Sequence, residues 1–167
     1  MPQLLWDSSA LIKQYLPEPG RASVNALFAL SPAVPMAATY LTYAETAAAL
    51  RRNVNAGNIQ PAAFNSARVL LDSMVLNNPD FLLLSVDDAA VLAGVTLTDV
   101  HNLNSTDAAI LAAYLRYARS QPAGNPVCVL VASDQRMIRT ANAEGLQTFN
   151  PEAVAAADVA AALAAIG

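Results

Sequence analysis

The chain has 167 residues, of which 55% are hydrophobic and only 13% are charged, and its formal net charge is -4. Proteins usually carry about 25% charged residues, so charges are sparse here, and the acidic balance excludes a protein that binds nucleic acid through bulk positive charge. Any phosphate-bearing substrate must therefore be held by individual arginines or by metal ions.

The length suggests one domain with a substantial core. Cys128 is the only cysteine, which excludes a disulfide framework or a zinc cluster built from cysteines and favours a reducing, cytoplasmic location. The chain starts without the basic and apolar regions of a secretory signal, and polar residues and prolines interrupt its longest apolar stretch, so we expect no membrane span.

In the first half of the chain, the apolar run 3–6 predicts a buried strand that ends at Asp7. A helix capped by Ser8 or Ser9 follows. Further on, capping, proline and spacing signals predict a helix over 21–30, a strand over 33–38, a helix that Thr39 caps and that runs to about 53, and a helix from Pro61 to the break at 77–80.

In the second half, the apolar run 81–86 predicts an internal parallel strand covered on both faces. The remaining elements expected are a short helix from 87 to about 95, a loose connection over 96–103, a helix that Ser105 or Thr106 caps and that runs to about 119, a strand over 127–131, a helix from Asp134 to Gly145, a strand over 146–149, and an alanine-rich helix capped by 150–152. This alternation predicts an α/β fold in which helices flank a mostly parallel sheet in three layers.

Four acidic residues could share one site: Asp7, Glu45, Asp107 and Asp134. Asp7 and Asp134 each follow an apolar strand, which places them at the carboxyl edge of the sheet, where open α/β sheets bind ligands. Glu45 stands on an apolar helix face, where an ionisable group usually has a partner or a purpose.

Each acid also has an ordinary structural interpretation. Asp7, Asp107 and Asp134 could be helix caps or dipole partners, and Glu45 could pair with Arg51 or Arg52. If the four converge, however, their mutual repulsion requires cations to neutralise it, and oxygen-only ligands suit Mg²⁺ or Mn²⁺. No imidazole is needed, and we expect the only histidine, His101, at the surface.

The segment around Asp7 resembles the opening motif of PIN-domain proteins, in particular VapC-type ribonuclease toxins: Asp7-Ser8-Ser9-Ala10-Leu11-Ile12-Lys13-Gln14-Tyr15-Leu16-Pro17-Glu18-Pro19-Gly20. Three later blocks, 42–52, 105–112 and 132–151, support the resemblance in family order. It implies a PIN-like nuclease domain over 1–151, with 152–167 as a C-terminal alanine-rich helix packed on the same domain.

The resemblance also implies a metal-dependent endoribonuclease with Asp7, Glu45, Asp107 and Asp134 as its catalytic and metal-binding residues. Ser9 matches a position that supports the site. Ser133 is the second residue expected to support it, because Ala132 stands where the family commonly has a hydroxyl and that hydroxyl is here on Ser133. Candidate contacts to RNA phosphates are Lys13, Arg51, Arg52, Arg116, Arg119 and Arg136, and the alternative for each is an ordinary solvated surface.

The resemblance implies a cognate antitoxin and a homodimer, the latter in keeping with the apolar helices, particularly 153–166. Two alternatives stay open: an RNA-processing nuclease without an antitoxin, and a scaffold that binds RNA or protein without cutting. A phosphate-transfer receiver or phosphatase is disfavoured, because no Asp-x-Asp pair follows the first strand and no glycine-rich phosphate loop is present.

Overall fold

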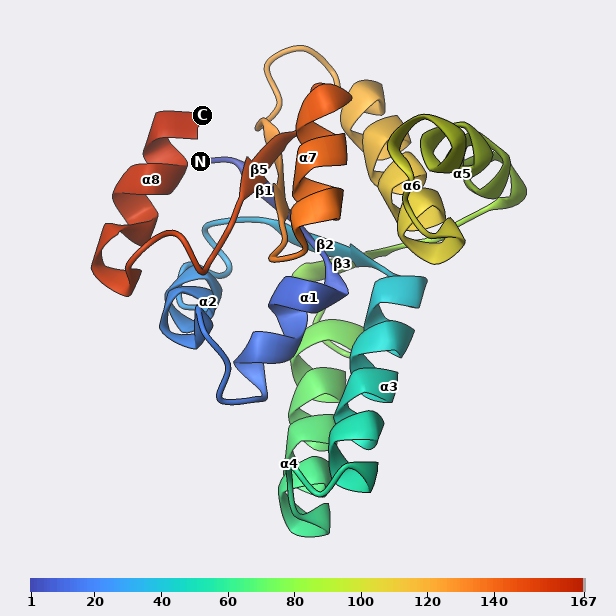
Figure 1. Cartoon of the computed structure of the whole chain (residues 1–167). Coiled ribbons are helices and arrows are strands. Elements are labelled where there is room, and N and C mark those ends of the chain that lie inside the picture. Colours follow the sequence, from blue (N-terminus) through green and yellow to red (C-terminus); the bar gives the residue numbers. More distant parts are fainter. Residues whose placement is uncertain (167) are drawn as a thin grey trace.

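The computed structural model describes residues 1–166 and shows a five-stranded sheet between two layers of helices (Figure 1). The strands are β1 (Gln3–Trp6), β2 (Met36–Thr39), β3 (Phe81–Leu84), β4 (Cys128–Val131) and β5 (Gln147–Phe149). Their order is β3-β2-β1-β4-β5, and every neighbouring pair is parallel. The predicted α/β fold is confirmed, with a sheet that is parallel throughout.

Two buried clusters separate the helices between the faces of the sheet. One cluster packs against α1 (Ser8–Leu11), the 3-10 turn η1 (Ile12–Gln14), α2 (Arg21–Phe28), α3 (Tyr40–Asn55), α4 (Pro61–Leu71) with its π-helical extension η2 (Asp72–Leu76), and α8 (Val159–Ile166). The other packs against α5 (Asp88–His101), α6 (Ser105–Ser120) and α7 (Gln135–Ala143). Side chains alternate between the two clusters along β1, where Leu4 and Trp6 face one layer and Leu5 the other.

Strand β3 is an edge strand, so the prediction of an internal strand covered on both faces is wrong. Within residues 1–166 it pairs with β2 alone, and Leu82 is 43% exposed. An apolar run indicates burial but cannot show where a strand stands in the sheet, because strand order depends on the crossover connections.

Helix α5 is longer than the short helix predicted, and residues 96–101 are helical, not a loose connection. Asp87 caps its start by accepting a 2.9 Å hydrogen bond from the backbone N–H of Ala90. Gly94 packs against the backbone of Ala108 and Ala109, where any Cβ would clash. This contact with α6 stabilises a segment whose threonines and valines have low helix propensity.

Three predicted caps also differ. Asp7 itself caps α1 in place of Ser8 or Ser9, and Asn104 caps α6 in place of Ser105 or Thr106. The last helix begins at Val159, after the 3-10 turn η3 (Ala156–Asp158), and not directly after 150–152. The cap predicted at Thr39 is confirmed, and the helix predicted to begin at Asp134 has Asp134 as its N-cap.

Candidate active site

Asp7 lies where β1 ends and α1 begins, in the middle of the sheet's carboxyl edge. Its backbone N–H donates to the carbonyl of Val131 on β4 at 2.9 Å, and its side chain is only 3% exposed. The hydroxyl of Ser9 donates to Asp7 Oδ2, and the backbone N–H of Ser9 does so at 2.9 Å. Burial raises the pKa of Asp7 despite these hydrogen bonds, and the charge of Asp134 adds to the rise.

Asp134 follows the neighbouring strand β4 and caps α7. Its Oδ1 accepts hydrogen bonds from the backbone N–H groups of Arg136 at 2.7 Å and Met137 at 3.0 Å. The prediction that Asp7 and Asp134 share the carboxyl edge of the sheet is therefore confirmed, because β1 and β4 are parallel neighbours.

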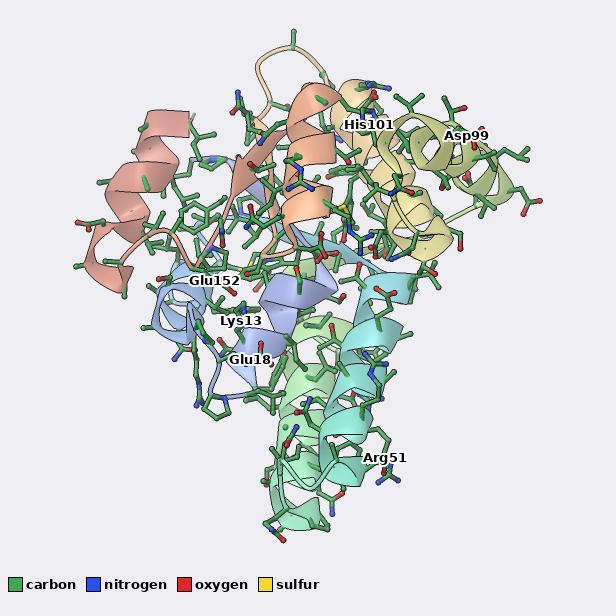
Figure 2. The ribbon with its side chains drawn as sticks, in the orientation of Figure 1. Lys13, Glu18, Arg51, Asp99, His101 and Glu152 are labelled. Carbon is green, nitrogen blue, oxygen red and sulfur yellow. The ribbon has the colours of Figure 1, made fainter. Side chains whose placement is uncertain are left out.

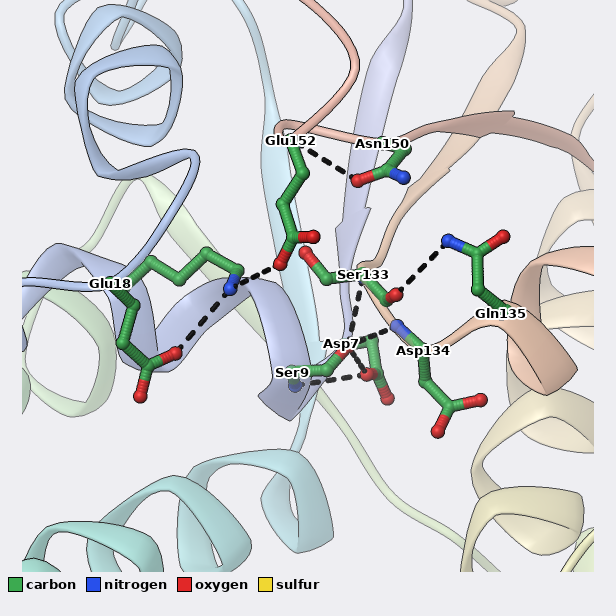
Figure 3. A network of polar contacts seen from close by, with 9 residues as sticks. Asp7, Ser9, Glu18, Ser133, Asp134, Gln135, Asn150 and Glu152 are labelled. Atoms are coloured by element: carbon green, nitrogen blue, oxygen red, sulfur yellow. Dashed lines mark hydrogen bonds and ion pairs between the residues drawn. The ribbon is translucent and has the colours of Figure 1, made fainter.

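Ser9 joins these two strand ends (Figure 3). Its hydroxyl oxygen donates to Asp7 and accepts hydrogen bonds from the backbone N–H of Ser133 at 2.9 Å and of Asp134 at 3.1 Å. The hydroxyl of Ser133 is buried without a hydrogen-bond partner in the part of the chain that the structure describes. Support for the site thus comes from the Ser9 side chain, whereas Ser133 contributes its backbone.

Glu45 reaches the same edge from α3. Its Oε2 is buried and makes no hydrogen bond to any described residue. Burial raises the pKa of Glu45, and the charges of Asp107 and Asp7 raise it further. The structure records no ion pair from Glu45 to Arg51 or Arg52 within residues 1–166.

Asp107 lies in the first turn of α6, and the side chain of Asn104 makes hydrogen bonds to both its backbone and its carboxylate. Asn104 Oδ1 accepts from the backbone N–H of Asp107 at 2.9 Å, and Asn104 Nδ2 donates to Asp107 Oδ2 at 2.6 Å. Burial, followed by the charges of Asp7 and Asp134, raises the pKa of Asp107 to about 6. The pKa of Asp7, Glu45 and Asp107 is therefore raised in each case by at least one other of the four acids, and Asp134 acts on two of them.

The phenol of Tyr114 connects the elements that carry three of these acids. It donates to the carbonyl of Trp6 at 2.5 Å and accepts from the backbone N–H of Thr39 at 3.1 Å. It also lies 3.1 Å from Thr42 Oγ1. One buried side chain on α6 thus ties together the ends of β1 and β2 and the start of α3. Sequence reasoning missed Tyr114, although its position seven residues after Asp107 places both on one face of α6.

The donor set suits a hard divalent cation, because it consists of carboxylate oxygens that repel one another when ionised. Within residues 1–166, however, no group of three or more His, Cys, Asp or Glu side chains is gathered closely enough to hold a metal ion as it stands. Mg²⁺ usually keeps several waters and binds through one or two carboxylates, so a hydrated ion fits this more open spacing.

Lys13 is not available to a phosphate, and this candidate contact is corrected. Its side chain is 4% exposed, and its ammonium group lies 2.8 Å from Glu152 and 3.4 Å from Glu18 (Figure 2). The sequence pattern of the helix did not predict the burial of Lys13, because this burial comes from the segment after β5, which is far away in the sequence.

Three of the arginines proposed as phosphate contacts are occupied elsewhere. Arg116 pairs with Asp87, and Arg119 lies 3.5 Å from a carboxylate oxygen of Glu144. The guanidinium of Arg51 lies over the ring of Phe64, 4.8 Å from its centroid. Of the six candidates, Arg52 and Arg136 are exposed, and their charges act on Glu45 and Asp107 respectively.

His101 is in the last turn of α5, not in a loop, and its side chain is 19% exposed. Its Nε2 lies 2.9 Å from Glu144 Oε1. The expectation of a surface histidine is therefore wrong, and the residue instead links α5 to the end of α7.

None of the helices described is both long enough and apolar enough to cross a membrane. No family model matches the chain, and no curated protein matches it.

Solved structures match the fold over nearly the whole chain. FitAB, solved bound to the IR36 DNA fragment, is similar with a TM-score of 0.64 and 15% identity over 92% of this chain and 98% of that chain. VapC20 of Mycobacterium tuberculosis, a toxin that cleaves the sarcin-ricin loop, is similar with a TM-score of 0.62 and 14% identity over 86% of this chain and 96% of that chain. A chain of a toxin-antitoxin complex from Klebsiella pneumoniae is similar with a TM-score of 0.56 and 19% identity over 89% of this chain and 98% of that chain.

Proposed function

We propose that this chain, which has the fold of VapC-type PIN-domain toxins, is a divalent-metal-dependent endoribonuclease and the toxin of a toxin-antitoxin pair. The observation that carries the proposal is the convergence of Asp7, Glu45, Asp107 and Asp134 on one edge of the sheet, where neighbouring acids raise the pKa of Asp7, Glu45 and Asp107. The similarity to a toxin that cleaves the sarcin-ricin loop supports RNA as the substrate.

Asp7 and Asp107 are the side chains that we expect to hold a Mg²⁺ or Mn²⁺ ion directly, with Glu45 and Asp134 binding it directly or through its waters. When bound, the ion would activate a water molecule for attack on a phosphodiester and neutralise charge on the leaving oxygen. Asp7 is oriented by Ser9 and Asp107 by Asn104, so both carboxylates are held in place before substrate arrives.

The four acids have separate tasks in this proposal. Burial lowers the local dielectric around Asp7, which strengthens its attraction for a cation. Glu45 keeps one buried carboxylate oxygen without a hydrogen-bond partner among the described residues, and its carboxylate is our candidate for the group that accepts a proton from the attacking water.

The test is cleavage of a structured RNA in the presence of Mg²⁺ or Mn²⁺ by the wild type and by Asp7→Asn. We expect Asp7→Asn to lose activity, because it keeps the shape of the side chain but removes its charge. Asp99→Asn is the matched control, because Asp99 is exposed on α5 and its substitution changes the net charge by the same amount (Figure 2). Equal cleavage by the wild type and Asp7→Asn would overturn the proposal.

The partner is part of the same proposal. One solved structure of the same fold is a toxin-antitoxin complex, which supports an antitoxin for this chain. Co-expression with the product of an adjacent small reading frame should give a complex that lacks nuclease activity. Nuclease activity that no small protein inhibits would indicate an RNA-processing enzyme instead. Homodimer formation and a cytoplasmic location stay predictions, and light scattering at working concentration tests the first.

A further inference from the structure

The basic side chains divide into paired and unpaired groups. Of the 9 lysines and arginines in the sequence, four form ion pairs in the structure: Lys13, Arg68, Arg116 and Arg119. Five form none within residues 1–166: Arg21, Arg51, Arg52, Arg136 and Arg139. Acidic side chains outnumber basic ones in this chain, so an arginine that lies close to an acidic site and forms no ion pair requires an explanation.

Arg52 extends the same face of α3 that carries Glu45. The two residues are seven apart, which is about two helical turns or 10 Å along the axis. No hydrogen bond or ion pair ties the Arg52 side chain to the rest of residues 1–166, and the residue is exposed. Its positive charge weakly opposes the rise in the pKa of Glu45.

Arg51 provides the contrast. It is next to Arg52 in the chain but is rotated by about 100° around the helix. Its guanidinium lies over the ring of Phe64 on α4, and Figure 2 shows it at the far end of the α3–α4 pair. The two arginines thus share charge, exposure and helix, but only Arg52 is on the side of the acids.

Arg136 approaches the acids from α7. Its backbone N–H donates to Asp134 Oδ1 at 2.7 Å, which places it in the first turn of the helix, directly beside that carboxylate. Its side chain is exposed and forms no ion pair with any described residue. Its positive charge opposes part of the rise in the pKa of Asp107. Helices α3 and α7 lie on opposite sides of α1, the helix that starts at Asp7 (Figure 1).

We propose that Arg52 and Arg136 bind two phosphates of one RNA strand, on either side of the phosphate that lies at the acidic edge. This inference rests on the proposed function and adds the path of the substrate. A strand that crosses a cluster of carboxylates in a protein of net charge -4 needs local cations to offset repulsion, and these two arginines are exposed, form no ion pair within residues 1–166 and lie on the helices that carry Glu45 and follow Asp134. Arginine also suits this task because its planar fork binds phosphate oxygens bidentately.

The test measures binding of a synthetic RNA stem-loop by Asp7→Asn protein in Mg²⁺ over a range of salt concentrations. In that background, Arg52→Ala and Arg136→Ala are compared with Arg51→Ala and Arg116→Ala, which remove the same charge elsewhere. Removing one arginine that binds a phosphate should reduce the slope of log K against log salt by about 0.7, and removing both should reduce it by about 1.4. Each single substitution should also weaken binding by roughly fivefold.

Slopes for Arg52→Ala and Arg136→Ala that match those of Arg51→Ala and Arg116→Ala would overturn the inference, as would a parent protein that shows no salt-dependent binding. The cleavage assay keeps this failure separate from failure of the proposed function. If the wild type cleaves RNA but the four slopes agree, only the path of the strand is wrong. If the slopes differ as expected but the wild type cleaves nothing in Mg²⁺ or Mn²⁺, the chain binds RNA along this path without cutting it.

Discussion

The hydroxyl oxygen of Ser9 accepts a hydrogen bond from the backbone N–H of Asp134 at 3.1 Å, although the two residues are 125 positions apart in the sequence. The same hydroxyl donates to Asp7. A single small side chain therefore fixes the distance between the acids at the ends of β1 and β4. Any change in this contact should affect both acids at once, which makes it a sensitive point for testing the site.

Replacing Ser9 with Ala should destabilise the protein by about 1–3 kcal/mol, because the N–H groups of Ser133 and Asp134 lose their acceptor. Nuclease activity should fall by about 10–100-fold, as is typical when residues that orient metal ligands are removed. Urea unfolding and cleavage rates measure the two effects. Ser133→Ala is the control. It should change stability and cleavage rate little, because the Ser133 hydroxyl has no hydrogen-bond partner among residues 1–166. Equal effects of the two substitutions would contradict the bridging role of Ser9.

Tyr114→Phe should destabilise the protein by about 1–3 kcal/mol, because the carbonyl of Trp6 and the N–H of Thr39 would lose a buried partner. The change should also lower nuclease activity of the folded protein, since the phenol positions the elements that carry Asp7 and Glu45. Tyr117→Phe is a matched control on the same helix, where the half-buried phenol exchanges hydrogen bonds of 2.9 and 3.0 Å with the side chain of Gln3. A cleavage rate that stays at the wild-type level in Tyr114→Phe would show that the phenol serves stability alone.

Asp107→Asn should make the metal-free protein more stable at pH 7 while it abolishes cleavage. The folded-state pKa of Asp107 is about 6, above its ordinary value of 3.8, so the unfolded state releases the proton first. Stability should therefore fall as pH rises from about 4 to about 6 and stay level above, and Asp107→Asn should flatten this decline. Urea unfolding at pH 5 and pH 7 in EDTA tests the sign. Asp99→Asn should leave the decline in place.

Added Mg²⁺ should raise the melting temperature of the wild type at pH 7 but should do so much less for Asp107→Asn. A ligand that binds only the folded state stabilises it by about 2.7 kcal/mol at a concentration 100 times its dissociation constant. The effect should weaken below pH 6, because a protonated Asp107 cannot bind a cation. Identical shifts in the two proteins would place the cation elsewhere.

Lys13→Met should cost about 1–3 kcal/mol of stability, because the buried ammonium joins Glu18 before α2 to Glu152 after β5. The two glutamates are partly exposed and can be hydrated again, which keeps the cost below that of an isolated buried charge. The salt dependence of RNA binding should not change, since Lys13 does not reach solvent. A reduced slope in Lys13→Met would show that this lysine does contact phosphate.

Local patterns in the sequence determined most of what places Asp7 and Asp134. An apolar run followed by an acid and a helix predicts a strand, a cap and a ligand-binding edge wherever the chain goes afterwards, because these signals depend on neighbouring residues. The Thr39 cap and the start of α4 at Pro61 followed from the same short-range chemistry. Where signals compete over a few residues, as with Asp7 against Ser8 and Ser9, the sequence placed the cap only to within two positions.

The tertiary structure decided whatever depends on segments distant in the chain. The edge position of β3 follows from strand order, the length of α5 from the contact of Gly94 with α6, and the burial of Lys13 from a glutamate 139 residues away. The bridge through Ser9 and the contacts of Tyr114 belong to the same class. The sequence by itself specified which residues carry charge and which segments are strands or helices, whereas only packing decided which charges meet, because burial and pairing arise when the helices close over the sheet.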